Sequence, residues 1–90
     1  MMNEFLHVGF DAFINVAKIR LIAPIDADKL RREMKRREID KGSVLFWNTA
    51  AGKETKSVIL LDDGMLVASG VSSETLVKRF NEIVRGGTKE

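Results

Sequence analysis

Basic side chains gather in one part of the chain, between residues 29 and 41. Seven of the fifteen lysine and arginine residues lie there: Lys29, Arg31, Arg32, Lys35, Arg36, Arg37 and Lys41. Proteins commonly bind the phosphate backbone of a nucleic acid through basic side chains that are grouped on one helix or strand. Acidic residues are interleaved with them: Asp26, Asp28, Glu33, Glu38 and Asp40. The local excess is therefore only two positive charges, and a solvated face held by salt bridges is an equally good interpretation.

Motifs of catalysis and metal binding are missing from this sequence. A phosphate-binding loop needs a glycine five residues before its Gly-Lys pair and Ser or Thr after it. Around Lys53 the chain has Trp47 and Glu54 at those places. The single histidine, His7, has no neighbouring carboxylate or cysteine with which to form a base and a nucleophile. We therefore expect no enzyme, no metal site and no cofactor.

Length and composition indicate one small globular domain. The chain has 90 residues, 44% of them hydrophobic and 31% charged, with a net charge of +2 and no cysteine. A core of this size is marginal without disulfides or metal, so association with further copies is the remaining route to stability. No apolar segment approaches the roughly 20 residues that span a bilayer. The start, Met1 to Glu4, also lacks the features of a signal peptide, so we expect a cytoplasmic protein.

Hydrophobic periodicity predicts an α+β domain with the order β-β-α-β-β-β-α. We expect strands over residues 5–8, 15–23, 43–49, 56–61 and 65–69, and helices over 27–40 and from Ser72 or Ser73 to Gly86-Gly87, with a frayed tail after it. An Asp63-Gly64 turn should join the last two strands, because this pair between apolar runs is a strong hairpin signal.

The strand over residues 15–23 should place two basic side chains on its outer face. Side chains alternate along a strand, so Lys18 and Arg20 lie opposite the apolar side. That apolar side is expected to face the core: Ala17, Ile19, Leu21 and Ala23.

The helix over residues 27–40 should begin at an Asp26 cap and end before Gly42 in a left-handed position. Its narrow apolar stripe is Ala27, Leu30 and Met34. Toward solvent lie Arg32, Lys35 and Arg36, with Ile39 among them. We expect the i, i+4 ion pairs Asp28–Arg32 and Glu33–Arg37. So thin a stripe predicts a lightly held helix or one that packs on a neighbouring subunit.

The strand over residues 43–49 is apolar on both sides, with Val44 and Phe46 facing one way and Leu45 and Trp47 the other. A strand of this kind needs cover on both faces. A second subunit or a helix of the same chain could supply the second cover.

Short motifs stand in a characteristic order along most of the chain. They are His7-Val8-Gly9-Phe10, Val16-Ala17-Lys18-Ile19, Ala23-Pro24, Asp40-Lys41-Gly42, Gly52-Lys53-Glu54-Thr55-Lys56-Ser57-Val58-Ile59 and the run from Ser69 to Phe80. In this order and spacing they resemble the bacterial RemA family of biofilm-matrix regulatory proteins. The resemblance covers about residues 5–80, so the chain is expected to be a single RemA-like domain over residues 1–90.

The resemblance implies a DNA-binding transcriptional regulator that works as a ring-like homo-oligomer. The basic positions of the family correspond here to Lys18, Lys53 and Lys56. Where family members tend to read Gly-Arg-Arg-Thr-Arg, this chain reads Gly-Lys-Glu-Thr-Lys from Gly52. Lysine keeps the charge but loses the bidentate fork of arginine, and Glu54 repels phosphate.

We therefore expect a self-assembled α+β domain that binds double-stranded DNA mainly by contacts to the phosphate backbone of the DNA. The basic patch of each protomer would be repeated around the oligomer. The expected contact residues are Lys18, Lys53 and Lys56 from the resemblance, and Arg32, Lys35 and Arg36 from the helix geometry. Two alternatives remain open. One is a homo-oligomeric scaffold or protein-interaction module without DNA binding, and the other is an RNA-binding module.

Overall fold

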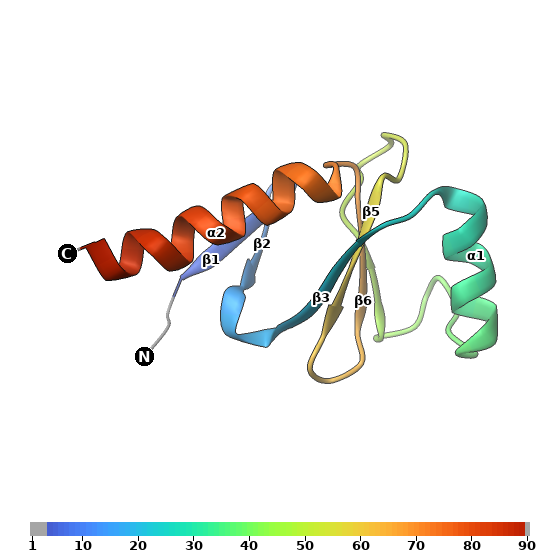
Figure 1. Cartoon of the computed structure of the whole chain (residues 1–90). Coiled ribbons are helices and arrows are strands. Elements are labelled where there is room, and N and C mark those ends of the chain that lie inside the picture. Colours follow the sequence, from blue (N-terminus) through green and yellow to red (C-terminus); the bar gives the residue numbers. More distant parts are fainter. Residues whose placement is uncertain (1–3, 90) are drawn as a thin grey trace.

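Two helices cover opposite faces of a small twisted sheet in the computed structural model, which describes residues 4–89 (Figure 1). The elements are β1 (Phe5–Gly9), β2 (Ala12–Asn15), the 3-10 turn η1 (Val16–Lys18), β3 (Ile19–Pro24), α1 (Ala27–Arg36), β4 (Phe46–Asn48), β5 (Ser57–Leu61), β6 (Leu66–Ser69) and α2 (Ser73–Lys89). The predicted α+β class is confirmed, with one strand more than expected. The predictions for Met1 to Asn3 and for Glu90 lie outside the described residues.

The main sheet has the strand order β3-β5-β6-β4, in which only the β4–β6 pair is parallel. Alternate residues of β5 and β6 enter two separate apolar clusters. Val58, Leu66 and Ala68 pack with Leu30 and Met34 of α1. On the other face of the sheet, Ile59, Leu61 and Val67 pack with apolar side chains of β1, β2 and α2. The basic helix α1 is thus anchored on the sheet of its own chain.

Loops gather at two opposite ends of this sheet, the Gly64 end and the Gly52 end. The Gly64 end comprises η1 and the loop over residues 62–65, and the main-chain N–H of Asp62 donates to the carbonyl of Lys18 there (2.9 Å). The Gly52 end comprises the β1–β2 loop, residues 9–11, and the connection over residues 49–56. Lys56 N–H donates to Ser69 O at that end (2.8 Å). Gly52 and Gly64 both have positive φ, at 84° and 91°.

The prediction of one strand over residues 15–23 is wrong, because the chain turns at η1 before β3 begins. The side chain of Asn15 accepts a hydrogen bond from Ala17 N–H (2.9 Å) and caps this turn. A bulge between Ile19 and Leu21 then shifts the register against β5. The side chains that face the core therefore differ from those predicted: Val16 is buried, whereas Leu21 and Ala17 are exposed. Residues 12–14, for which no element was predicted, form β2 together with Asn15, and this strand pairs with β1.

The helix predicted over residues 27–40 ends at Arg36. Its cap at Asp26 is confirmed, since the Asp26 carboxylate accepts from Lys29 N–H (2.8 Å). At the other end Glu38, with φ 58°, takes the left-handed position expected near Gly42. Ile39 N–H donates to Met34 O (2.8 Å), which closes a Schellman motif. Ile39 is consequently buried and not among the exposed residues, while Ala27 is exposed.

Three further boundaries differ from the predictions. The strand expected over residues 43–49 is only β4, at one edge of the sheet, and Val44 before it is 85% exposed. The loop between β5 and β6 has four residues, 62–65, and not the two predicted at Asp63-Gly64, although Leu61 N–H still bonds to Met65 O across it (3.0 Å). Helix α2 continues through Gly86-Gly87 to Lys89. Glycine ends a helix only where it turns left-handed, and both glycines here keep helical geometry.

Candidate nucleic-acid interface

Two of the predicted contact lysines, Lys53 and Lys56, are exposed together at the Gly52 end. A tight turn presents the first of them: Lys53 N–H donates to Ala50 O (3.0 Å). The central residues of this turn, Ala51 and Gly52, both have positive φ, as in a type I′ turn. Lys56 follows just before β5. Glu54, which directly follows this turn, is exposed as well. This glutamate replaces a residue that is typically arginine in the family, so a negative charge lies close to the two lysines.

Three buried hydroxyl groups hold the Gly52 end in place. Thr49 Oγ1 donates to Ala68 O (2.7 Å), and Ser57 Oγ donates to Val71 O (2.7 Å). Ser69 Oγ donates to the carbonyl of Val8. All three residues are at most 5% exposed, and buried hydroxyls that are satisfied in this way rigidify their surroundings. Thr49 and Ser57 were not predicted from the sequence, although a polar residue next to an apolar run is a signal that could have indicated them.

Lys18 is exposed but lies apart from the other two lysines, at the Gly64 end. It was predicted on the outer face of a strand, and the structure places it in the last position of η1 instead. Residues 56 and 62 mark the two ends of β5, six positions apart, which is about 20 Å of extended chain. A single protomer therefore does not bring the three family-matched lysines together.

The outer face of α1 carries the remaining predicted contacts, Arg32, Lys35 and Arg36, all exposed. Among residues 4–89, Arg32 and Lys35 make no ion pair. Arg36 is different, because it bonds to the Glu33 carboxylate. The outward orientation is confirmed for all three, and two of them are fully available to an external anion.

Glu33 forms ion pairs with two arginines at the C-terminal end of this helix, Arg36 and Arg37. Its carboxylate accepts from Arg37 Nε (2.6 Å), as predicted, and also from Arg36. The hydrogen bond from Arg37, followed by that from Arg36, lowers the pKa of Glu33 below its ordinary value despite an opposing desolvation effect. Asp28 pairs with Arg31 and not with the predicted Arg32. Arg32 is therefore left unpaired within the part of the chain that the structure describes.

The charge balance at the Gly52 end is neutral in one protomer. Lys53 and Lys56 stand with Glu54 and with Asp11 of the β1–β2 loop, and all four are exposed. An excess of positive charge belongs to α1, on the adjacent face of the sheet. The attraction between a single Gly52 end and phosphate is thus local and weak. Several protomers must each contribute a Gly52 end before the affinity for DNA becomes useful.

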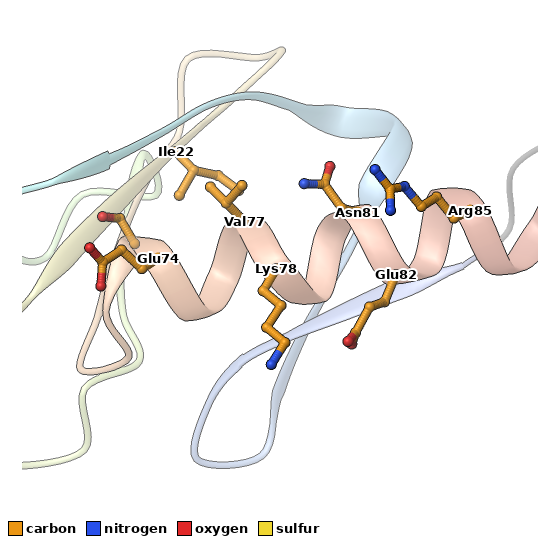
Figure 2. A pocket seen from close by; sticks show the side chains of 8 residues that line it. Ile22, Glu74, Val77, Lys78, Asn81, Glu82 and Arg85 are labelled. Carbon is orange, nitrogen blue, oxygen red and sulfur yellow. The ribbon is translucent and has the colours of Figure 1, made fainter.

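Away from the Gly52 end, a further hollow lies along helix α2. This hollow of about 650 Å³ is open and is lined by both acidic and basic residues (Figure 2). Figure 2 shows Ile22 and Val77 close together where β3 passes the helix, with Lys78 and Glu82 pointing to the other side. Within residues 4–89 there is no cluster of three or more potential metal ligands. No helix in that range is long and apolar enough to cross a membrane.

Comparison with known proteins gives a consistent family. Residues 5–80 match the RemA-like family, described as extracellular matrix regulatory protein A-like. A protein of Coprothermobacter proteolyticus, provisionally named a regulatory protein, is 35% identical over 82 residues, covering 91% of this chain and 75% of its own. A similarly named protein of Lachnoclostridium phytofermentans is 27% identical over 81 residues (90% and 86%). Another, from Nitratidesulfovibrio vulgaris, is 25% identical over 80 residues (89% and 90%).

Proposed function

Because the chain belongs to the RemA-like family of regulatory proteins, we propose that it regulates transcription by binding double-stranded DNA. The observation that carries this proposal is the Gly52 end, with Lys53 and Lys56, which the sequence resemblance matches to basic positions of the family. They are exposed on a surface that buried hydroxyls hold rigid. The family description names the extracellular matrix, so genes of the biofilm matrix are the proposed targets.

Binding rests on phosphate contacts and not on base recognition. Lysine acts as a point charge with no planar fork, and phosphate contacts position a protein without carrying sequence information. Arg32 and Lys35 of α1, which make no ion pair within residues 4–89, add attraction from the adjacent face. Affinity should therefore fall steeply as salt rises, and it should differ little between duplex sequences.

Useful affinity requires several copies, and the sheet offers two surfaces for assembly. Beside the edge strand β3, Leu21 and Val77 are 50% and 42% exposed. At the opposite edge, around β4, Val44 and Trp47 are 85% and 41% exposed. Two different apolar surfaces on opposite edges favour head-to-tail contacts, which form a ring when the rotation closes. We propose such a homo-oligomer, in which every protomer repeats its Gly52 end along one rim.

A scaffold that assembles without binding DNA is the second candidate. The specific observation in its favour is that Glu54 and Asp11 cancel the charge of the two lysines at the Gly52 end. RNA binding is a third candidate, favoured by exposed rings on one face of the β1–β2 hairpin. Phe5 and Phe13 are each 56% exposed, and the rings of His7 and Phe13 lie 4.9 Å apart. Such rings can stack on unpaired bases.

Gel-shift titrations across a range of salt concentrations separate the three candidates. The protein is titrated in parallel against a DNA duplex and a single-stranded RNA of equal length. The proposed function predicts that the duplex is retained at moderate salt and released steeply as salt rises. Retention of the RNA alone would favour the RNA-binding module, and retention of neither would favour the scaffold.

A further inference from the structure

Phe10 is an aromatic residue that the fold does not use for its core. Its side chain is 75% exposed, compared with 56% for Phe5 and for Phe13. It stands with Asp11 at the tip of the β1–β2 hairpin, between the paired residues Gly9 and Ala12. An exposed aromatic ring at a loop tip forgoes the stabilisation that burial would give it, so a role outside the core is expected.

The position of Phe10 is fixed from two sides. On one side Gly9 lies against the backbone of Thr49, so closely that a β-carbon on residue 9 would be 2.5 Å from the Thr49 carbonyl oxygen. On the other side the Ser69 hydroxyl donates to the carbonyl of Val8, two residues before Phe10. The loop tip is therefore held against the 49–53 turn by backbone contact and by a buried hydrogen bond.

This arrangement places Phe10 and Lys53 around one hollow. The hollow measures about 310 Å³ and is also lined by Ala51 and Gly70. A β-carbon on residue 70 would lie 3.3 Å from the Lys53 β-carbon, so the turn packs closely on this wall. The Gly52 end thus holds the backbone of both residues in place and presents an exposed aromatic side chain and a lysine around one hollow.

We propose that Phe10 is a DNA contact residue that enters the minor groove while Lys53 holds an adjacent phosphate. The inference rests on the proposed function and adds to it a contact of a different chemical kind. An apolar ring gains nothing from a phosphate, but it can insert between base steps, unstack them partly and bend the duplex. The phosphates repel the Asp11 carboxylate beside the ring, so insertion of the ring requires that this carboxylate stays outside the groove.

The test compares Phe10→Ala with Phe13→Ala, a matched removal of an exposed phenylalanine from the same hairpin. Duplex affinity is measured by fluorescence anisotropy at several salt concentrations, and bending by energy transfer between the duplex ends. Phe10→Ala should weaken duplex binding by about tenfold and reduce the bend. It should leave the salt slope unchanged, because no charge is lost. Phe13→Ala should behave like the unaltered protein, and Lys53→Ala should instead flatten the salt slope.

Three other results would overturn the inference, and they show whether the inference alone or also the proposed function fails. If the unaltered protein binds the duplex and Phe10→Ala binds and bends it equally well, this inference is wrong while the proposed function stands. If the unaltered protein does not bind the duplex, the proposed function fails and the inference with it. If Phe10→Ala changes the oligomer mass or lowers the melting temperature by more than about 4 °C, Phe10 is a structural residue. Phe10→Leu, which keeps an apolar tip, should retain part of the affinity.

Discussion

Gly9 and Thr49 are in direct backbone contact, and this contact joins the β1–β2 hairpin to the Gly52 end of the main sheet. A β-carbon on residue 9 would lie 2.5 Å from the Thr49 carbonyl oxygen and 3.0 Å from the Thr49 hydroxyl oxygen. Neither atom can move freely, because Thr49 N–H and Oγ1 both bond to Ala68 O (2.8 and 2.7 Å). Only glycine therefore fits at position 9.

Replacement of this glycine should destabilise the protein. We expect Gly9→Ala to lower the free energy of unfolding by about 1–3 kcal/mol, the usual cost of forcing an extra methyl group into a closely packed place. Urea unfolding followed by circular dichroism measures the change. Gly42→Ala is the matched control, since nothing lies within 4 Å of its added β-carbon. If both variants unfold at the same urea concentration, the contact between the hairpin and the sheet is not as close as described.

The exposed apolar edges lead to a prediction about mass. Light scattering at micromolar protein should give several times the 10.1 kDa of one chain. Leu21→Asp should lower that mass, because a charge beside the β3 edge must be desolvated in the contact. Asp62→Lys, an exposed change at the Gly64 end, should leave the mass unaltered. A folded monomer before any substitution would contradict both the ring and the avidity argument.

Glu33 should give the protein a small, defined dependence of stability on pH. Its pKa is lowered in the folded state by Arg37 and then by Arg36, so its contribution is present at neutral pH. The contribution is lost as the pH falls through the folded-state pKa. Glu33→Gln should cost about 0.5 kcal/mol at pH 7, as exposed helix pairs do, and nothing in acid. Asp40→Asn, at a residue without an ion pair in the described region, should show no such difference in urea unfolding at the two pH values.

Local sequence patterns predicted where most helices and strands lie. They did not predict the side-chain hydrogen bonds and burial that change the boundaries of these elements. The apolar runs around Asp63-Gly64 predicted β5 and β6, and the Asp26 cap predicted the start of α1. The alternation across residues 15–23 failed, because the Asn15 side chain bonds to Ala17 N–H and starts a 3-10 turn. At the end of α1 the burial of Ile39 outweighs the cost of a left-handed Glu38, so Gly42 is not needed.

The candidate site was predictable only in part for a related reason. The exposure of Lys18, Lys53 and Lys56 follows from their polarity, and the structure confirms it. Their separation onto two ends of the sheet depends on the antiparallel pairing of β3 with β5. Such pairing is set by contacts between distant segments, which local periodicity does not encode. The proximity of Phe10 to Lys53 depends on the same long-range packing.

Glu54 should limit DNA binding in this member of the family. Glu54→Arg removes a repulsion and adds an attraction, a change of two charges per protomer. Each further phosphate neutralised steepens the salt slope by about 0.9 on duplex DNA, and the effect is repeated over each protomer in contact. We expect tighter duplex binding, a steeper slope and an unchanged oligomer mass, measured by gel shift and light scattering. Glu74→Arg, an equal charge change at an exposed position on α2, is the control. Equal effects of the two variants would indicate a general charge effect and no contact at the turn.

The most direct test of the central claim is the salt dependence of duplex affinity for two charge-reversal variants. One is Lys53→Glu/Lys56→Glu at the Gly52 end, and the other is Arg32→Glu/Arg36→Glu on α1. If the Gly52 end is the main contact, the lysine variant should lose duplex binding and its salt slope should fall by about 0.9 for each phosphate released. The arginine variant should retain most of both, and both variants should keep the oligomer mass. Unchanged binding by the lysine variant, together with loss of binding by the arginine variant, would place the interface on α1 and contradict this account.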